Sequence, residues 1–158
     1  MIKVKVVGAS GYGGIGIIEL LLKHPEAKIS SLVAMESVGM PISQIWPHLM
    51  GFCDMEVTAP DDPRAQEPAD VVFMATPDRV GMNNAAAELA KGAKVIDYSG
   101  DFRFNTAEEY AEYATRIGKD PVHAAPDLLP LSVYGAPELH RADINVDRKI
   151  VGNPGCFA

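Results

Sequence analysis

The sequence predicts an α/β fold, a doubly wound and mostly parallel sheet with helices on both faces. Short apolar segments alternate with segments of helical periodicity along most of the chain, which is typical of parallel strands joined by helices. The first junction between a strand and a helix is rich in glycine. With 158 residues, 47% of them hydrophobic and 22% charged, the chain is long enough for one domain with a buried core.

The first half of the chain opens with one βαβ unit. Pro25 marks the end of its helix, because proline cannot continue the hydrogen-bond ladder. After this unit several prolines interrupt the pattern, so we expect residues 36–68 to be mostly loop, with a short strand near residues 55–58. The strand, helix and strand of the βαβ unit are expected at residues 2–7, 13–23 and 29–34.

The second half continues the alternation of strands and helices. Gly92 stands where a helix commonly ends, and Thr106 is a favourable N-cap. Residues 118–137 are rich in proline and are interpreted as irregular loop. The expected strands are residues 69–75, 94–98 and 148–151, and the expected helices are residues 80–91 and 106–117. Ligands in such sheets bind beyond the carboxyl ends of the strands, so polar residues at those ends are candidates for function.

The segment from Gly8 to Gly14 is the first candidate ligand site. Gly8, Gly11 and Gly14 are spaced three residues apart, Gly13 is an additional glycine, and Ser10 and Tyr12 lie between them. A turn of this kind lets a pyrophosphate approach the backbone and directs helix N–H groups at its charge. A tight turn without a ligand is the alternative. The order of strand, turn and helix favours a Rossmann-like site for a dinucleotide.

The residues after the second strand bear on the choice between NAD and NADP. An acid there bonds a ribose hydroxyl, whereas an arginine favours a 2′-phosphate. Glu36 would repel a 2′-phosphate if it pointed inward. Ser37, Val38 and the backbone of Gly39 are positions that could receive one. These residues leave both cofactors open.

Cys156 follows the last expected strand in a Pro-Gly turn. A cysteine in this position is exposed enough to react, and nearby backbone dipoles can favour its thiolate. The alternative for any free cysteine is a small buried hydrophobe, and that alternative fits Cys53 better. Because the dinucleotide turn is present, we interpret Cys156 as a nucleophile. We expect both cysteines to be free thiols.

Polar residues at other strand ends complete the candidate site. Ser99 and Arg103 follow one expected strand and can both hold an oxyanion, the arginine through a bidentate fork. The alternative is that Asp97 or Asp101 pairs with Arg103 and shapes the loop. Further residues expected to line the cofactor side are Thr76, Pro77 and Asp78.

Composition excludes several other classes of function. A formal net charge of −7 argues against nucleic acid or an anionic membrane surface as a partner. No apolar segment is long enough to span a bilayer and no signal peptide is recognisable, so we expect a cytoplasmic protein. The four histidines and two cysteines lack the spacing of metal ligands, so no metal is expected.

Taken together, these segments resemble N-acetyl-gamma-glutamyl-phosphate reductase, the NADP-dependent enzyme of arginine biosynthesis. The matching segments occur in order along the whole chain, at residues 8–14, 24–26, 69–73, 95–103, 134–138 and 153–156. The resemblance implies that the Cys156 thiolate attacks N-acetyl-glutamyl 5-phosphate and expels phosphate, and that NADPH then reduces the thioester to the semialdehyde. It also implies NADP contacts at residues 10–13 and 37–39, and substrate contacts at Ser99, Arg103 and Asn153.

The resemblance further implies a longer protein. Residues 1–158 would be the dinucleotide-binding domain, ending just after the catalytic cysteine, and a substrate and dimerisation domain would supply the histidine base and a homo-oligomeric interface. We therefore expect weak or no turnover from this chain alone. We also expect the Cys156 sulfur and the nicotinamide to share one crevice. Two alternatives stay open: a non-catalytic redox-sensing module, and the same chemistry on an aminoadipyl phosphate of lysine biosynthesis.

Overall fold

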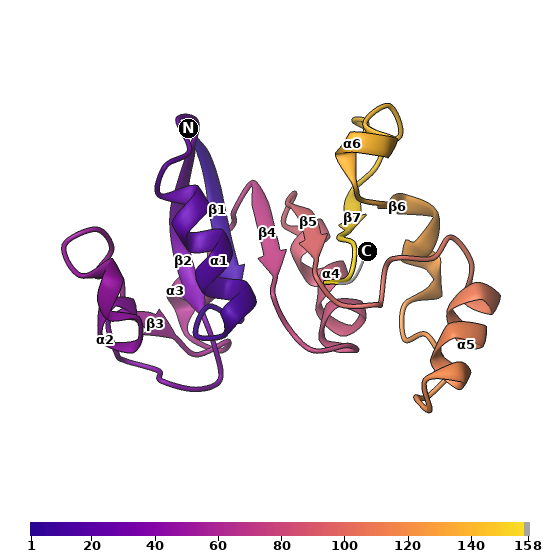
Figure 1. Ribbon diagram of the computed structural model, residues 1–158, viewed down its shortest axis with the longest axis horizontal. Coiled ribbons are helices and arrows are strands. Elements are labelled where there is room, and N and C mark those ends of the chain that lie inside the picture. The colour runs from indigo at the N-terminus through magenta and orange to yellow at the C-terminus, as the bar shows by residue number, and fades with distance from the viewer. Residues whose placement is uncertain (157–158) are drawn as a thin grey trace. The chain divides into compact units, whose positions relative to one another are not determined.

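The computed structural model describes residues 1–156 of the chain (Figure 1). These residues form two compact units, one of residues 1–75 with 91–93 and the other of residues 76–90 with the chain from 94 onward. Every strand pair described within each unit is parallel. The predicted class, a Rossmann-like α/β fold, is confirmed. Within residues 1–156, no helix has both the length and the apolar character needed to cross a membrane.

The sheet of the first unit has the strand order β3-β2-β1-β4. The strands are β1 (Ile2–Val7), β2 (Ala27–Val33), β3 (Val57–Thr58) and β4 (Val71–Met74). Val7 is in register with Val33 of β2 and with Met74 of β4, so the carboxyl ends of these strands meet at one edge. The chain moves from β1 to β2 and β3 in one direction and returns past β1 to β4. Right-handed crossovers therefore place the connecting segments on opposite faces of this sheet.

Helix α1 (Tyr12–Leu21) packs its apolar face on the core of the first unit. Gly14, Ile15, Ile18 and Leu21 recur at helical spacing and are buried. The three apolar residues Ile15, Ile18 and Leu21 pack in the same core as Val4, Val6, Leu32 and Cys53. Cys53 is 6% exposed, and both cysteines are free thiols, as predicted.

The second unit contains a sheet of order β5-β7-β6. Its strands are β5 (Lys94–Asp97), β6 (Ser132–Tyr134) and β7 (Ile150–Gly152), and its longer helices are α4 (Val80–Ala90) and α5 (Ala107–Arg116). Thr106 caps α5 as predicted, because its side chain accepts a hydrogen bond from the Glu109 N–H. The Glu109 carboxylate accepts in turn from the N–H of Asn105 at 3.0 Å.

The structure differs from the prediction in the two proline-rich segments. The segment expected to be mostly loop, residues 36–68, contains β3 where it was predicted and also α2 (Ile42–Ile45), η1 (Pro47–Leu49) and α3 (Pro63–Gln66). The segment 118–137 contains η2 (Pro126–Leu131) and β6, and α6 (Pro137–His140) begins at its end. Four of these short helices carry proline in their first turn. Proline suits that position because its missing N–H is not needed there, so here it starts helices instead of interrupting them.

Candidate functional site

The glycine turn joins β1 to α1 as predicted. The Gly8 N–H donates to the carbonyl oxygen of Val33 at 2.8 Å, and Gly8 itself has φ 83, in the region that favours glycine. A Cβ on Gly14 would lie 2.3 Å from the Gly8 carbonyl oxygen, so only glycine fits where the helix approaches the turn. The N-cap residue is Gly11, which has no side chain to cap the helix. Within the described part of the chain, the first turn of α1 also contains no acidic residue. The N-terminus of α1 therefore retains N–H groups for an anion.

The loop after β2 is exposed at Glu36 and turns sharply at Ser37, which has φ 61. The Met40 N–H closes this turn on the Ser37 carbonyl oxygen at 3.2 Å. The N–H of Gly39 donates to the Val57 carbonyl oxygen at 2.8 Å, so this backbone donor already has a protein acceptor. Of the positions predicted to receive a 2′-phosphate, the Gly39 N–H is therefore already used within the protein.

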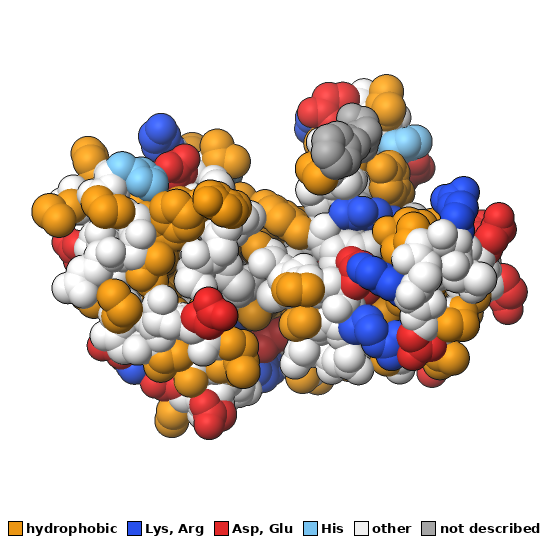
Figure 2. Space-filling view, turned by 60° about the horizontal axis from the view of Figure 1, so that its bottom comes forward, with side chains coloured by type: hydrophobic (Ala, Val, Ile, Leu, Met, Phe, Trp, Pro, Cys, Tyr) orange, Lys and Arg blue, Asp and Glu red, His pale blue; other side chains and the backbone are white. Residues whose placement is uncertain are grey.

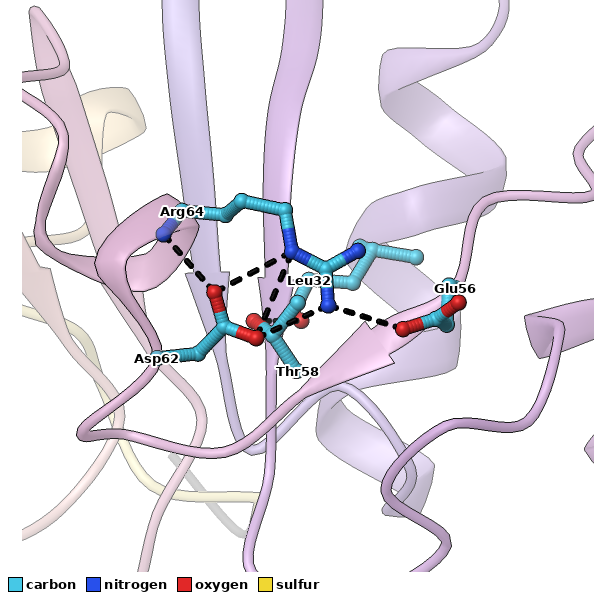
Figure 3. Close-up of polar contacts among 5 residues, drawn as sticks. All are labelled: Leu32, Glu56, Thr58, Asp62 and Arg64. Carbon is cyan, nitrogen blue, oxygen red and sulfur yellow. Dashed lines mark hydrogen bonds and ion pairs between the residues drawn. The ribbon is translucent and has the colours of Figure 1, made fainter.

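Arg64 is the arginine of the first unit, and its guanidinium is hydrogen-bonded to two carboxylates (Figure 3). Its Nη2 lies 2.8 Å from both Glu56 and Asp62, and its Nε bonds Asp62 at 3.1 Å. These hydrogen bonds hold the pKa of Asp62 below its ordinary value. Beside them, the Thr58 hydroxyl donates to the Leu32 carbonyl oxygen at 3.0 Å (Figure 3). These contacts hold the end of β3 in place. The Arg64 guanidinium already bonds carboxylates of the protein.

The loop after β7 carries Cys156, whose side chain is exposed as predicted. The Asn153 N–H continues the ladder by donating to the Asp97 carbonyl oxygen at 2.8 Å. Arg103 donates from Nε to the Asn153 carbonyl oxygen at 2.7 Å and from Nη2 to the Tyr98 carbonyl oxygen at 2.6 Å. A Cβ on Gly155 would lie 3.2 Å from Nη1 of Arg103. The guanidinium thus anchors the loop that presents the thiol.

The hydrogen bonds described for Arg103 go to backbone carbonyls and not to Asp97 or Asp101. Both oxygens of the Asp101 carboxylate accept the Arg79 N–H at 2.9 Å, and one accepts the Met82 N–H at 3.0 Å. This carboxylate therefore caps the start of α4. Arg103 donates to backbone carbonyls, which orders the loop. Its positive charge also opposes, in part, the rise in the pKa of Asp97 that burial causes.

Ser99 is buried and has two protein partners. Its hydroxyl donates to Oδ2 of Asp97 at 2.5 Å and accepts from the Asp101 N–H at 3.1 Å. Asp97 is fully buried, and its Oδ1 has no hydrogen-bond partner within residues 1–156. Burial raises the pKa of Asp97 to about 7, and the nearby charge of Asp101 acts in the same direction. A Cβ on Gly81 would lie 2.6 Å from that Oδ1, so α4 packs directly on this carboxyl.

Cations and acids gather on the second unit near the start of α4 (Figure 2). Lys119 pairs with Asp78, and Arg79 lies 3.2 Å from Asp120. Burial works against ionisation of Asp78, but the Gly100 N–H and Lys119 outweigh it and lower its pKa. Asp78 follows Thr76 and Pro77 in the segment that the sequence predicts to line the cofactor side. Arg79, Lys119 and Asp120 were not predicted, because the pair of Lys119 with Asp78 joins residues 41 positions apart.

The predicted site residues fall into two groups. The first unit brings together the glycine turn and the loop 37–39, and the second unit brings together Arg103, Asn153 and Cys156 at neighbouring strand ends. Thr76 and Pro77 begin the second unit, and the Thr76 hydroxyl oxygen is buried without a hydrogen-bond partner in the described chain. The expectation that the thiol and the nicotinamide share one crevice stays a prediction.

Comparison with known proteins gives consistent matches. Residues 3–146 match the family described as semialdehyde dehydrogenase, NAD binding domain. Over 99% of its length, the chain is 38% identical to the N-acetyl-gamma-glutamyl-phosphate reductase of Citrifermentans bemidjiense and 41% identical to that of Janthinobacterium sp.. It spans 43% and 44% of the lengths of these two proteins.

Solved structures share the fold. Aspartate semialdehyde dehydrogenase II of Vibrio cholerae, in complex with ASA, has a TM-score of 0.68 and 18% identity, covering 99% of this chain and 42% of that one. The Candida albicans aspartate semialdehyde dehydrogenase with NADP has a TM-score of 0.55 and 22% identity, covering 78% and 41%. The resemblance inferred from the sequence is thus confirmed, and the chain belongs to the semialdehyde dehydrogenase NAD-binding domain family.

Proposed function

We propose that the protein containing this chain reduces N-acetyl-glutamyl 5-phosphate to the semialdehyde, with NADPH as reductant and release of phosphate. The observation that carries this proposal is the exposed thiol of Cys156 on a loop fixed by Arg103, in a chain of the semialdehyde dehydrogenase family. The names of relatives at 38% and 41% identity support the same substrate. We also propose that the protein is cytoplasmic and that it forms a homo-oligomer, and the resemblance implies the homo-oligomer.

The glycine turn fits a dinucleotide. Helix α1 starts on a glycine N-cap with no acid in its first turn, which leaves a positive helix end for a pyrophosphate. Gly14 keeps this end close to β1 because no Cβ fits there. The Ser37 hydroxyl would bond the 2′-phosphate of NADP, and the exposed Glu36 need not oppose it because it can turn to solvent.

The thiol performs the covalent step. The Cys156 thiolate forms a bond to the acyl carbon, the bond from that carbon to the phosphate oxygen breaks, and phosphate leaves with the electron pair. NADPH, held at the glycine turn, would supply the hydride that reduces the resulting thioester to the aldehyde, and Cys156 would leave as the thiolate. Arg103 keeps the cysteine loop in place, and its Nη1, beside Gly155, would bond the departing phosphate or the carbonyl oxygen.

The test is a coupled measurement on the protein containing this chain. With the acyl phosphate, we expect one phosphate released per NADPH consumed. Cys156→Ser should abolish both, while Cys53→Ala, a change at a buried thiol, should retain them. Consumption of NADPH by Cys156→Ser at the wild-type rate would exclude the thioester route. Binding of NADPH without any turnover would favour the redox-sensing alternative, and a preference for the aminoadipyl phosphate would identify the lysine-pathway reaction.

A further inference from the structure

Trp46 contacts the glycine turn from outside it. The indole Nε1–H donates to the carbonyl oxygen of Ser10 at 3.3 Å. The indole ring also lies 5.5 Å from the ring of Tyr12, between centroids, with the two planes tilted by 56°. Tyr12 is the first residue of α1 and is 85% exposed. Trp46 thus provides both a polar and an aromatic contact to the segment that would receive the pyrophosphate.

The hydrogen bond from Trp46 holds the carbonyl group of the peptide unit between Ser10 and Gly11. The carbonyl of Ser10 and the N–H of Gly11 belong to the same planar peptide and point in opposite directions. The Gly11 N–H donates to the Gly8 carbonyl oxygen at 3.1 Å, while the Ser10 oxygen accepts from Trp46. Both polar groups of this peptide are therefore held, so its plane cannot rotate freely. The N–H groups that follow it in α1 keep the direction that this plane imposes.

The segment that carries Trp46 is itself anchored. Ile42 and Leu49 on either side of it are buried in the core of the first unit, at 0% and 3% exposure. His48 reaches α1 again, with its Nε2 2.7 Å from the Glu19 carboxylate. The Ile42 N–H donates to the Met55 carbonyl oxygen at 2.8 Å. Trp46 is therefore held in position before any ligand binds, so its bond to the turn can act as a fixed support.

We propose that Trp46 is a positioning residue for dinucleotide binding, holding the Ser10–Gly11 peptide so that the start of α1 is ready for a pyrophosphate. This inference rests on the proposed function, in which the glycine turn binds NADPH. Binding to a turn that is already ordered costs less entropy than binding to a mobile one. Loss of the indole donor should therefore weaken ligands that contain a pyrophosphate and spare ligands that lack one.

The test compares two ligands on wild type and Trp46→Phe, which keeps an aromatic ring and removes the donor. For NADPH we expect the Kd to rise about three- to tenfold, the value of one hydrogen bond. For adenosine 2′-phosphate, which has no pyrophosphate, the Kd should stay within about twofold of wild type on the same reasoning. Phe52→Leu is the matched control, because Phe52 lies on the same segment and is 79% exposed. It should leave both constants unchanged.

Each outcome separates the inference from the function it rests on. If wild type fails to bind NADPH, the proposed function itself fails. If wild type binds but Trp46→Phe binds equally well, or loses both ligands equally, the positioning role is overturned. If Trp46→Phe does not fold, the positioning role is tested by hydrogen exchange of the indole N–H in the wild-type protein, followed by NMR. The chain contains one tryptophan, so it gives one indole N–H signal. Slow hydrogen exchange that slows further with NADPH supports the role, and exchange at the rate of a free indole overturns it.

Discussion

Arg103 binds the carbonyl oxygen of Asn153 through its Nε at 2.7 Å, three residues before the exposed thiol. The same guanidinium binds the Tyr98 carbonyl oxygen at 2.6 Å. Tyr98 and Asn153 directly follow Asp97 and Gly152, which are in register on the neighbouring strands β5 and β7. One side chain therefore ties together the carboxyl ends of two parallel strands and sets where the cysteine loop begins.

Removal of this guanidinium should loosen the loop. We expect Arg103→Ala to lower the free energy of unfolding by about 2–3 kcal/mol, because two charge-assisted bonds to backbone carbonyls are lost. Arg103→Lys should recover only part of it, since an ammonium cannot reproduce the planar fork. Chemical denaturation measures both. Arg116→Ala, at an exposed position in the last turn of α5, is the control and should change stability by less than about 0.5 kcal/mol. Equal losses at both arginines would contradict the anchoring role.

Two glycines of α1 should respond oppositely to alanine. At Gly14 a Cβ would lie 2.3 Å from the Gly8 carbonyl oxygen, whereas at Gly16 nothing lies within 4 Å. We expect Gly14→Ala to destabilise the fold by more than about 2 kcal/mol and to weaken NADPH binding. Gly16→Ala should stabilise it by about 0.5–1 kcal/mol, because alanine loses less backbone entropy in a helix. Thermal unfolding measures the changes in stability, and a titration with NADPH measures the change in binding. A tolerated Gly14→Ala would refute the close approach.

Asp97 should make stability depend on pH. Burial raises its pKa to about 7 from an ordinary 3.8, so between these values the folded protein holds a proton that the unfolded chain has lost. The stability that this group contributes is present at low pH and lost as pH rises through about 7. Relative to wild type, Asp97→Asn should therefore gain on the order of a few kcal/mol as pH rises across this range.

The comparison of unfolding free energies from acidic to mildly alkaline pH measures this effect. Asp61→Asn, at an exposed carboxylate, is the control and should follow the wild-type curve in parallel. A difference between wild type and Asp97→Asn that stays constant with pH would show that the buried carboxyl does not titrate in this range.

Ser37 should distinguish the two cofactors. Because we assign its hydroxyl to the 2′-phosphate, Ser37→Ala should raise the Kd for NADPH about three- to tenfold and leave the Kd for NADH unchanged. Isothermal titration with both cofactors measures this. Equal losses for NADPH and NADH would mean that Ser37 supports the loop geometry, where its φ is 61, and does not contact the phosphate.

Local chemistry made much of this structure predictable. The glycine turn, the parallel strands and the exposure of Cys156 follow from residue types at strand ends, where one short segment contains the whole signal. The capping role of Thr106 was likewise predictable, because its partner is only three residues away along the chain. These elements match the prediction to within a few residues.

What could not be predicted depends on contacts between distant segments. Trp46 reaches Ser10 across 36 positions, and Asp101 caps α4 from 22 positions away. Neither pairing leaves a periodic pattern in the sequence. The prediction also took proline as a breaker in segment 36–68, although Pro47 and Pro63 begin short helices. Ser99 could be placed at a strand end, but its burial and its bond to Asp97 required the fold.

The central claim is that Cys156 and the bound nicotinamide serve one reaction. The direct test is the rate of iodoacetamide alkylation at each cysteine, followed by peptide mass spectrometry, with and without NADPH. We predict that exposed Cys156 reacts much faster than buried Cys53, and that its rate changes saturably with NADPH, with a midpoint at the Kd of the cofactor. A Cys156 rate that NADPH leaves unchanged at saturation would contradict the account.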